Sequence, residues 1–201
     1  LIFFRGGMSP FIFQQWEKHD RARFRLVTEL AHSAFERFGE YREFIGKLML
    51  YDDIVTTMLL DMCCTSQEDV AGFVLTGIVP TGQAQQLQGN ILAIALAKPY
   101  RYQKIGGFLL QKGISIIQKN VKNNSLYSQI NTIGLTVAPD NEPAVKLFSK
   151  FGFEFVSESE EHYYASGVRA CNMVRPLYLP SETTVGLSNQ EQLGKNNNNN
   201  I

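Results

Sequence analysis

A continuous apolar run at residues 91–97 constrains the fold of this chain more than any other segment. A strand with one face in water alternates apolar and polar residues, so an unbroken apolar run predicts a strand buried on both faces. A helical pattern begins at Ile105, where apolar residues such as Leu109 and Ile116 recur on one side, and it ends near the Asn-rich segment 120–124. A central strand followed closely by a helix predicts a mixed α/β fold.

The remaining sequence predicts further strands and helices on both sides of this unit. Apolar residues from Leu26 to Phe38 recur at intervals of three and four, which indicates an amphipathic helix that stops at Gly39. The segments 54–62 and 70–79 predict the two strands of an antiparallel hairpin. The other expected elements are strands at 1–4, 133–137, 153–156 and 171–177, helices at 41–50 and 142–151, and a polar loop at 81–88.

Length and composition predict one folded domain followed by a polar end. The chain has 201 residues, of which 44% are hydrophobic, and this supports one substantial core. Beyond Pro180 the sequence is polar and ends in a run of asparagines, which cannot bury enough apolar surface to offset the ordering of the chain. We therefore expect a domain at 1–180 and a disordered polar tail at 181–201.

The charge balance and the cysteines argue against several kinds of partner and site. The 19 basic and 19 acidic residues leave no net charge, which argues against binding to nucleic acid or to a membrane surface. The longest apolar run is too short to span a membrane, which takes about 20 residues, and the sequence shows no signal-peptide pattern. Cys63, Cys64 and Cys171 have no metal-ligand spacing, so we expect no metal and a reducing, cytoplasmic location.

The turn between the central strand and its helix has the composition of an anion-binding site. Lys98, Arg101 and Lys104 supply positive charge. Gly106 and Gly107 stand in the first turn of the helix, whose amides have no partner within the helix and can be approached closely by a phosphate. The chain has neither the G-x-x-x-x-G-K-[ST] phosphate loop nor the G-x-G-x-x-G dinucleotide motif. In an alternative interpretation, the two glycines only allow tight packing of the helix.

Two segments resemble motifs of the GNAT acetyltransferase superfamily. Residues 101–106 are similar to its pyrophosphate loop, R/Q-x-x-G-x-G/A, with Lys104 where the first glycine is usual. Residues 135–153 are similar to L-x-V-x-x-x-N-x-x-A-x-x-x-Y-x-x-x-G-F, with Phe148 in place of the tyrosine. Either Lys104 takes a left-handed conformation, which costs a residue other than glycine roughly 1–2 kcal/mol, or the loop bends otherwise.

The resemblance implies the GNAT fold and acetyl-coenzyme A as acetyl donor, without a metal. In that fold two parallel strands of a mixed sheet, flanked by helices, splay apart so that pantetheine lies between them. The cofactor-binding residues that the resemblance implies are Leu96, Ala97, Lys98, Arg101, Tyr102, Gln103, Lys104, Ile105, Gly106, Gly107, Asn141, Ala144 and Phe148. For Asn141 the alternative is a helix cap, with Pro143 in the first turn, and for Phe148 it is a place in the helix core.

Candidates for proton transfer and acceptor contact gather before the last strand. The segment that begins with His162, Tyr163 and Tyr164 resembles the Y-Y followed by A-x-x-M of protein N-terminal acetyltransferases, which implies that both tyrosines contact the acceptor. Because Phe148 replaces the family's usual acid, Tyr164 or His162 is expected to carry the proton. Asn90, at the start of the central strand, is expected to position a water. The alternatives are packing for the tyrosines and a solvated surface position for the histidine.

The sequence leaves two functions open. The first is transfer of an acetyl group to an amine, on a protein N-terminus, a lysine or a small molecule, directly within a ternary complex. Glu158, Glu160 and Glu161 are its candidate bases, although a run of charges is usually a solvated face. The second, favoured by Lys104 and Phe148, is a catalytically silent module that keeps the fold and the coenzyme. The sequence predicts no particular oligomeric state.

Overall fold

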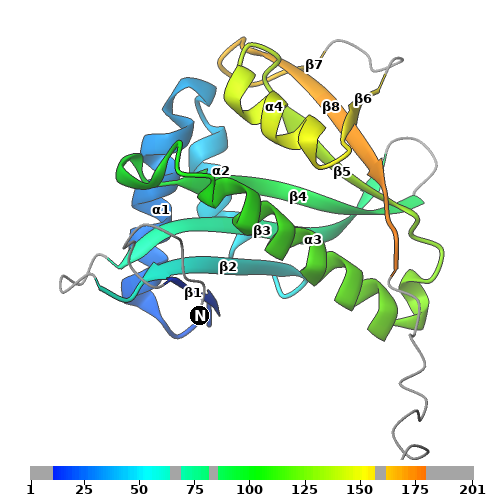
Figure 1. Cartoon of the computed structure of the whole chain (residues 1–201), viewed down its shortest axis with the longest axis horizontal. Helices are drawn as coiled ribbons and strands as arrows, with labels where there is room; N and C mark the ends of the chain where they lie inside the picture. The colour runs from blue at the N-terminus through cyan, green and yellow to red at the C-terminus, as the bar shows by residue number, and fades with distance from the viewer. Residues whose placement is uncertain (1–10, 64–68, 82–85, 157–161, 180–201) are drawn as a thin grey trace, which may run out of the picture.

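The computed structural model describes residues 11–63, 69–81, 86–156 and 162–179. With η for short 3-10 helices, its elements in chain order are β1 (Phe11–Gln15), α1 (Arg21–Phe35), η1 (Glu36–Phe38), α2 (Tyr41–Leu48), β2 (Ile54–Asp61), β3 (Val70–Thr81), β4 (Gln86–Leu96), η2 (Lys98–Tyr100), α3 (Ile105–Asn123), η3 (Ser125–Tyr127), β5 (Thr132–Val137), α4 (Glu142–Lys150), β6 (Glu154–Phe155), β7 (His162–Tyr163) and β8 (Arg169–Pro176). Helices α1 and α2 cover one face of the sheet, and α3 and α4 lie on the other (Figure 1).

The sheet has the order β1-β2-β3-β4-β5-β8-β6, and β7 pairs with β8. All of these pairs are antiparallel except β4 with β5. The parallel pairing extends only from Gly89↔Ile133 to Ile91↔Leu135, although β4 continues to Leu96. The two strands therefore separate beyond Ile91, which confirms the predicted mixed sheet with two splayed parallel strands.

Apolar side chains fill both faces of the sheet around β4. On the α3 side, Ile91 packs in one core with Leu110. On the side of α1 and α2, Ala93 packs in a second core with Val27 and Ile45. Each fully buried large apolar side chain contributes about 1.5–3 kcal/mol. The apolar run at 91–97 is therefore central, as its composition predicted.

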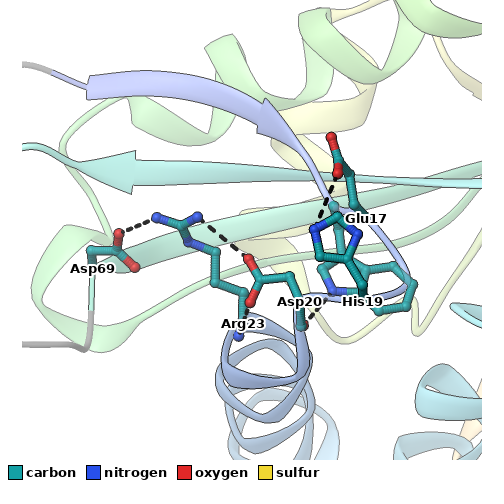
Figure 2. A network of polar contacts seen from close by, with 6 residues as sticks. Glu17, His19, Asp20, Arg23 and Asp69 are labelled. Carbon is teal, nitrogen blue, oxygen red and sulfur yellow. Dashed lines mark hydrogen bonds and ion pairs between the residues drawn. The ribbon is translucent and has the colours of Figure 1, made fainter.

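Polar side chains tie the start of α1 to the segment before β3 (Figure 2). The Asp20 carboxylate caps α1 by accepting from the Arg23 amide nitrogen at 3.0 Å. The Arg23 guanidinium reaches Asp69 at 2.8 Å and Asp20 at 3.4 Å. The hydrogen bond to Asp69 is the main reason that the pKa of Arg23 lies above its ordinary value. Trp16 Nε1 donates to the Asp20 carbonyl oxygen at 2.9 Å. Asp20 is therefore held both by Trp16, before the helix, and by Arg23, in its first turn.

The prediction of a loop at 81–88 is wrong for the residues that the structure describes there, 81 and 86–88. Thr81 ends β3 and Gln86 begins β4, and the two residues pair across the hairpin. Polar residues can form strand here because the ladder of backbone hydrogen bonds does not depend on the side chains, and alternate side chains of a strand leave the core. One consequence is that Asn90 lies inside β4, between Gly89 and Ile91 of the parallel pairing, rather than at its start.

Strands β1 and β7 were not predicted from the sequence. The former pairs with β2 and the latter with β8, and both are short. The strand predicted at 1–4 and the tail predicted at 181–201 lie outside the described residues. No helix in the described part combines the length and the apolar character needed to cross a membrane.

Candidate functional site

The turn between β4 and α3 has a strained backbone. Tyr102 and Lys104 have φ angles of 63° and 64°, in the left-handed region that favours glycine. Lys104 is the N-cap of α3, so of its two predicted alternatives the structure has the left-handed one. Strain of roughly 1–2 kcal/mol per residue persists only where the surroundings fix the backbone, and it is concentrated at functional sites.

Two side chains at the C-terminal end of η2 anchor this turn to the sheet. Arg101 Nε donates to the Leu96 carbonyl oxygen at 2.9 Å, at the end of β4. Tyr100 Oη donates to the carboxylate of Asp61 at 2.9 Å, and this buried residue ends β2. The turn is thus held to β2, two strands away in the sheet, as well as to β4, and these contacts help to fix its strained backbone.

The outer side of the turn carries its exposed polar groups. Lys98 and Lys104 are exposed, so their ammonium groups can reach a ligand at the start of α3. Tyr102 is 90% exposed. Gln103 Nε2 donates to the Pro99 carbonyl oxygen at 2.6 Å, which closes the turn on itself.

The glycines of α3 are of two kinds. A methyl group at Gly113 would lie 2.9 Å from the Val74 side chain, so close packing against β3 requires glycine there. At Gly106 and Gly107 the nearest atoms would be 3.4 Å from a methyl group, which is ordinary contact. Packing alone therefore does not explain the two glycines of the first turn, and their backbone can be approached closely.

The first turn of α3 faces α4 across the gap between the parallel strands. A methyl group at Gly106 would lie 3.4 Å from Leu147 of α4 and 3.7 Å from Leu96 of β4. The end of β4, the turn and the first turn of α3 thus lie close to the C-terminal half of α4. The predicted cofactor-binding residues from Leu96 to Gly107 therefore lie together, at the end of β4 and the start of α3.

The second motif builds the start and the core face of α4. Asn141 Oδ1 accepts from the Ala144 amide nitrogen at 3.4 Å, so Asn141 caps the helix. Phe148 is 5% exposed, and its ring lies 6.1 Å from that of Phe153 in an edge-to-face arrangement. The cap and the core position are confirmed. Contact of Asn141, Ala144 or Phe148 with a coenzyme stays a prediction.

A cavity of about 890 Å³ lies on the α2 side of the sheet and is termed the α2 pocket. It is lined by Glu40, Glu43, Phe44, Lys47, Leu48, Asn90, Ile91, Leu92, Thr136, Tyr163, Tyr164, Ala165, Ala170 and Asn172. The α2 pocket brings together Asn90, Tyr163 and Tyr164, which the sequence predicted for catalysis or acceptor contact. The other predicted proton carrier, the side chain of His162, and the candidate bases at 158, 160 and 161 lie outside the described part of the structure.

Tyr164 is held in a half-buried position by its neighbours. Its ring lies 4.4 Å from that of Phe38, centroid to centroid. Burial raises the pKa of Tyr164 to about 12, and the charge of Cys171 adds to this while that of Arg37 opposes it. The backbone is fixed as well, because the Tyr164 amide nitrogen donates to the Val168 carbonyl oxygen at 2.8 Å. At neutral pH this phenol is protonated and can donate a hydrogen bond.

Arg37 links the aromatic contact to the start of α4. Its guanidinium lies 5.0 Å from the centre of the Phe38 ring and 2.6 Å from both carboxylate oxygens of Asp140. Asp140 directly precedes the α4 cap, Asn141. The segment that packs on Tyr164 is therefore connected to the segment that carries the second motif.

Uncharged side chains surround the point where β4 and β5 separate. Asn90 Nδ2 donates to Gln88 Oε1 at 3.3 Å, and Thr136 Oγ1 donates to Asn172 Oδ1 at 2.9 Å. The strand β4 also has an irregular register opposite β3 at this point, where Thr76 pairs with Ile91. Gln88, Thr136 and Asn172 were not predicted from the sequence, because a single polar residue in a strand is typical of any solvated face.

Comparison with known proteins agrees with the geometry. Residues 23–153 match the model of the Acetyltransferase (GNAT) family. Over 90 residues the chain is 33% identical to an N-alpha-acetyltransferase of Sulfolobus acidocaldarius, covering 45% of this chain and 49% of that protein. An N-alpha-acetyltransferase of Sulfurisphaera tokodaii matches with the same identity and coverage. The match thus spans about half the length of these curated relatives.

Solved structures share the fold at low identity. Arabidopsis thaliana NAA60 in complex with a bisubstrate analogue superposes with a TM-score of 0.63 and 18% identity, covering 84% of this chain and 100% of that one. The ribosomal-protein-S18-alanine N-acetyltransferase from Escherichia coli gives a TM-score of 0.59 and 20% identity, covering 87% and 98%. At these identities the likeness establishes the arrangement of helices and strands.

Proposed function

Because the chain belongs to the Acetyltransferase (GNAT) family, we propose that it moves an acetyl group from acetyl-coenzyme A to an amine. The observation that carries the proposal is the gap between β4 and β5, which has the first turn of α3 on one side of the sheet and the α2 pocket on the other. A donor and an acceptor that enter from opposite sides would meet at this gap. Their meeting favours direct transfer within a ternary complex.

On the donor side, the start of α3 would hold the pyrophosphate. The first amides of the helix point their N–H groups outward, and Lys98, Arg101 and Lys104 add positive charge. Leu96 and Ala97, at the end of β4, would lie along pantetheine. The remaining contacts predicted from the sequence are Tyr102, Gln103, Ile105, Gly106, Gly107, Asn141, Ala144 and Phe148. Acetyl-coenzyme A would supply a thioester whose carbonyl carbon accepts the amine.

On the acceptor side, the α2 pocket would bind the amine. Tyr163 and Tyr164 line it and would contact the acceptor. The protonated phenol of Tyr164 would donate a hydrogen bond to the leaving sulfur and carry a proton to it, with His162 as the alternative carrier. Asn90 would position a water that takes the proton from the attacking amine.

A protein N-terminus is the acceptor that we favour over a lysine or a small amine. The two relatives quoted above carry the name N-alpha-acetyltransferase. Phe44 and Tyr163 line the pocket with 48% and 56% of their surface exposed, which offers an apolar contact to a first side chain. Glu40 and Glu43 give the pocket two carboxylates against the one ammonium of Lys47, which would favour a positively charged amino terminus.

A second candidate is a module that binds coenzyme A without turnover. The observation that favours it is the uncharged character of the separation point, where Asn90, Thr136 and Asn172 cannot act as bases near neutral pH. The presence of Phe148 in place of the motif's tyrosine points the same way. The enzyme remains the stronger proposal because water and Tyr164 give the protons another route.

Two measurements on the full chain separate these candidates. Isothermal calorimetry with acetyl-coenzyme A tests the donor site. Transfer is tested by measuring the release of free thiol with three kinds of acceptor: peptides with a free N-terminus, a lysine-containing peptide with a blocked N-terminus, and a polyamine. We expect binding and thiol release with free N-terminal peptides. Binding without release on every acceptor would favour the silent module, and absence of binding would refute both candidates.

A further inference from the structure

A second cavity, of about 800 Å³, adjoins the α2 pocket over the first residues of β4 and β5. Its polar lining includes Gln88, Asn90, Gln129, Asn131, Thr136 and Asn172. This cavity is termed the amide groove. It shares Asn90, Thr136 and Asn172 with the α2 pocket, so the two cavities meet where β4 and β5 separate.

The amide groove is polar without being charged. Of the described residues that line it, none carries a charge, while six have a carboxamide and three are threonines. A carboxamide offers two N–H donors and a carbonyl acceptor, which matches the hydrogen-bonding groups of a peptide backbone. The described lining can therefore satisfy an uncharged polar chain, but none of its side chains could pair with a charge.

Hydrogen bonds within the lining fix the direction of its amides. Asn90 Nδ2 donates to Gln88 Oε1 at 3.3 Å, and Gln88 Nε2 donates to Thr132 Oγ1 at 2.9 Å. Gly134 makes this line possible, because a methyl group there would lie 2.3 Å from Gln88 Oε1. The amide of Gln88 thus lies directly over the backbone of β5. The groove is ordered before a ligand enters, which lowers the entropy cost of binding.

We propose that the amide groove is an acceptor subsite, in which the polypeptide beyond the acceptor amine lies and where uncharged polar side chains are preferred. The inference rests on the proposed function, since that function puts the amine in the α2 pocket. Because the two cavities share three lining residues, an extended chain can pass from one cavity into the other. A charged side chain entering the groove would lose hydration without gaining a partner, and a small amine would not reach it.

Acceptors of matched sequence test the subsite on the unmodified protein. One is a dipeptide amide, and another is an octapeptide with the same first two residues followed by Ser, Asn and Gln. Two more octapeptides carry Glu or Lys at those later positions. We expect kcat/KM for the uncharged octapeptide to exceed that of the dipeptide amide about tenfold, mainly through KM, and both charged octapeptides to lose that gain.

Variants locate the effect in the groove. Asn131→Leu and Gln129→Leu each remove a carboxamide from the lining, and we expect each to reduce the ratio of kcat/KM between the uncharged octapeptide and the dipeptide amide. The matched control is Gln111→Leu, which removes an exposed carboxamide on α3 and should leave that ratio unchanged. Turnover of the dipeptide amide by the same preparation shows that each variant is folded.

The outcomes separate the subsite from the proposed function. Equal kcat/KM for all peptides, or equal gains for charged and uncharged octapeptides, would overturn the subsite while leaving acetyl transfer intact. Failure of every acceptor to react would overturn the function. In that case calorimetric binding of the octapeptides to protein saturated with coenzyme A still decides the subsite, because a preference for the uncharged octapeptide supports it and equal binding contradicts it.

Discussion

The two sides of the β4–β5 gap are built in different ways. On the donor side, one contiguous segment supplies the end of β4, a strained turn and the first turn of α3, and much of what it offers is backbone. On the acceptor side, the α2 pocket draws side chains from α2, β4, β5, β7 and β8. Backbone groups at a helix start suit one unchanging ligand, whereas side chains from separate elements suit a partner that varies.

The two sides also differ in charge. Three positive charges, Lys98, Arg101 and Lys104, surround the start of α3. The α2 pocket has charges of both signs, Glu40, Glu43 and Lys47, and only uncharged side chains such as Asn90 at the separation point. A charged site recognises an anion wherever it is exposed, but uncharged groups act only at hydrogen-bonding distance. We therefore expect changes on the donor side to alter coenzyme affinity and changes on the acceptor side to alter turnover.

The largest effect is expected for Tyr164→Phe, which removes the phenol from the α2 pocket and keeps the ring against Phe38. Loss of a proton carrier lowers kcat by roughly 10²-fold, while the Kd for acetyl-coenzyme A stays unchanged because the donor side is intact. Steady-state kinetics of thiol release and calorimetry measure the two quantities.

Tyr163→Phe is the matched control for this substitution. Tyr163 is 56% exposed and adjacent in sequence, so its hydroxyl is expected to affect KM for the acceptor more than kcat. If Tyr163→Phe and Tyr164→Phe reduced kcat equally, the assignment of the proton carrier to Tyr164 would be wrong. A rise in the Kd for acetyl-coenzyme A with Tyr164→Phe would break the separation between the two sides.

A pair of glycine substitutions in α3 tests whether the first turn is reserved for a ligand. Gly106→Ala is expected to raise the Kd for acetyl-coenzyme A about tenfold, which is about 1.4 kcal/mol, because a methyl group obstructs the close approach of the pyrophosphate. The same change should raise the free energy of unfolding by at most about 1 kcal/mol, since alanine favours helix and packing permits it. Calorimetry and urea denaturation check both.

Gly113→Ala should give the opposite result in the same helix. A methyl group there would lie 2.9 Å from Val74, and such overpacking is expected to lower the free energy of unfolding by about 1–3 kcal/mol. The Kd for acetyl-coenzyme A should be unchanged in the folded protein. Loss of stability without loss of affinity in Gly106→Ala would instead support the interpretation that these glycines serve only packing.

The pH dependence of stability provides a smaller test of the acceptor side. The pKa of Tyr164 is about 12 in the folded protein, against 10.0 ordinarily, so the unfolded chain releases this proton first. The stabilisation that the protonated, half-buried phenol contributes to folding is therefore complete below pH 10.0 and is lost as the pH rises to about 12. We expect the difference in unfolding free energy between the unmodified protein and Tyr164→Phe to shrink by about 1 kcal/mol across this range, allowing for solvent screening of a half-buried group.

Denaturant titrations at several pH values within this range measure that difference. All other ionisable groups are common to both proteins, so their contributions cancel in the comparison. A difference that stays constant would mean that the Tyr164 phenol is as hydrated in the folded protein as in the unfolded chain.

The donor side could be predicted from the sequence because its parts are contiguous. The apolar run at 91–97, the basic turn and the helix start at Ile105 all lie within a few residues of each other. The hydrogen bond that Tyr100 donates to Asp61 on another strand could not be predicted, because no local sequence pattern contains it. That contact depends on the strand order, and strand order is a property of the whole sheet.

The acceptor side could be predicted only where a motif marked it. Tyr163 and Tyr164 were expected from the tyrosine pair, and they do line the α2 pocket. Gln88 was missed because it belongs to a polar stretch that predicted a loop, and Asn172 because single polar residues in strands are common. Their importance arises from cross-strand neighbours such as Thr136, which periodicity does not identify.

The smallest expected effect concerns the residue at which the donor side departs from its motif. Lys104→Gly removes the left-handed strain at φ 64° and should raise the free energy of unfolding by about 0.5–1 kcal/mol, after the greater entropy of glycine in the unfolded chain is taken into account. Lys98→Gly is the matched control, because it removes the same charge from the same turn where φ is not positive, and it should not stabilise the protein. Each substitution should weaken acetyl-coenzyme A binding to a similar extent, since each removes one positive charge near the pyrophosphate. Thermal denaturation and calorimetry of the two variants separate the backbone effect from the charge effect. Stabilisation by both substitutions, or by neither, would mean that the left-handed backbone at Lys104 does not destabilise the protein.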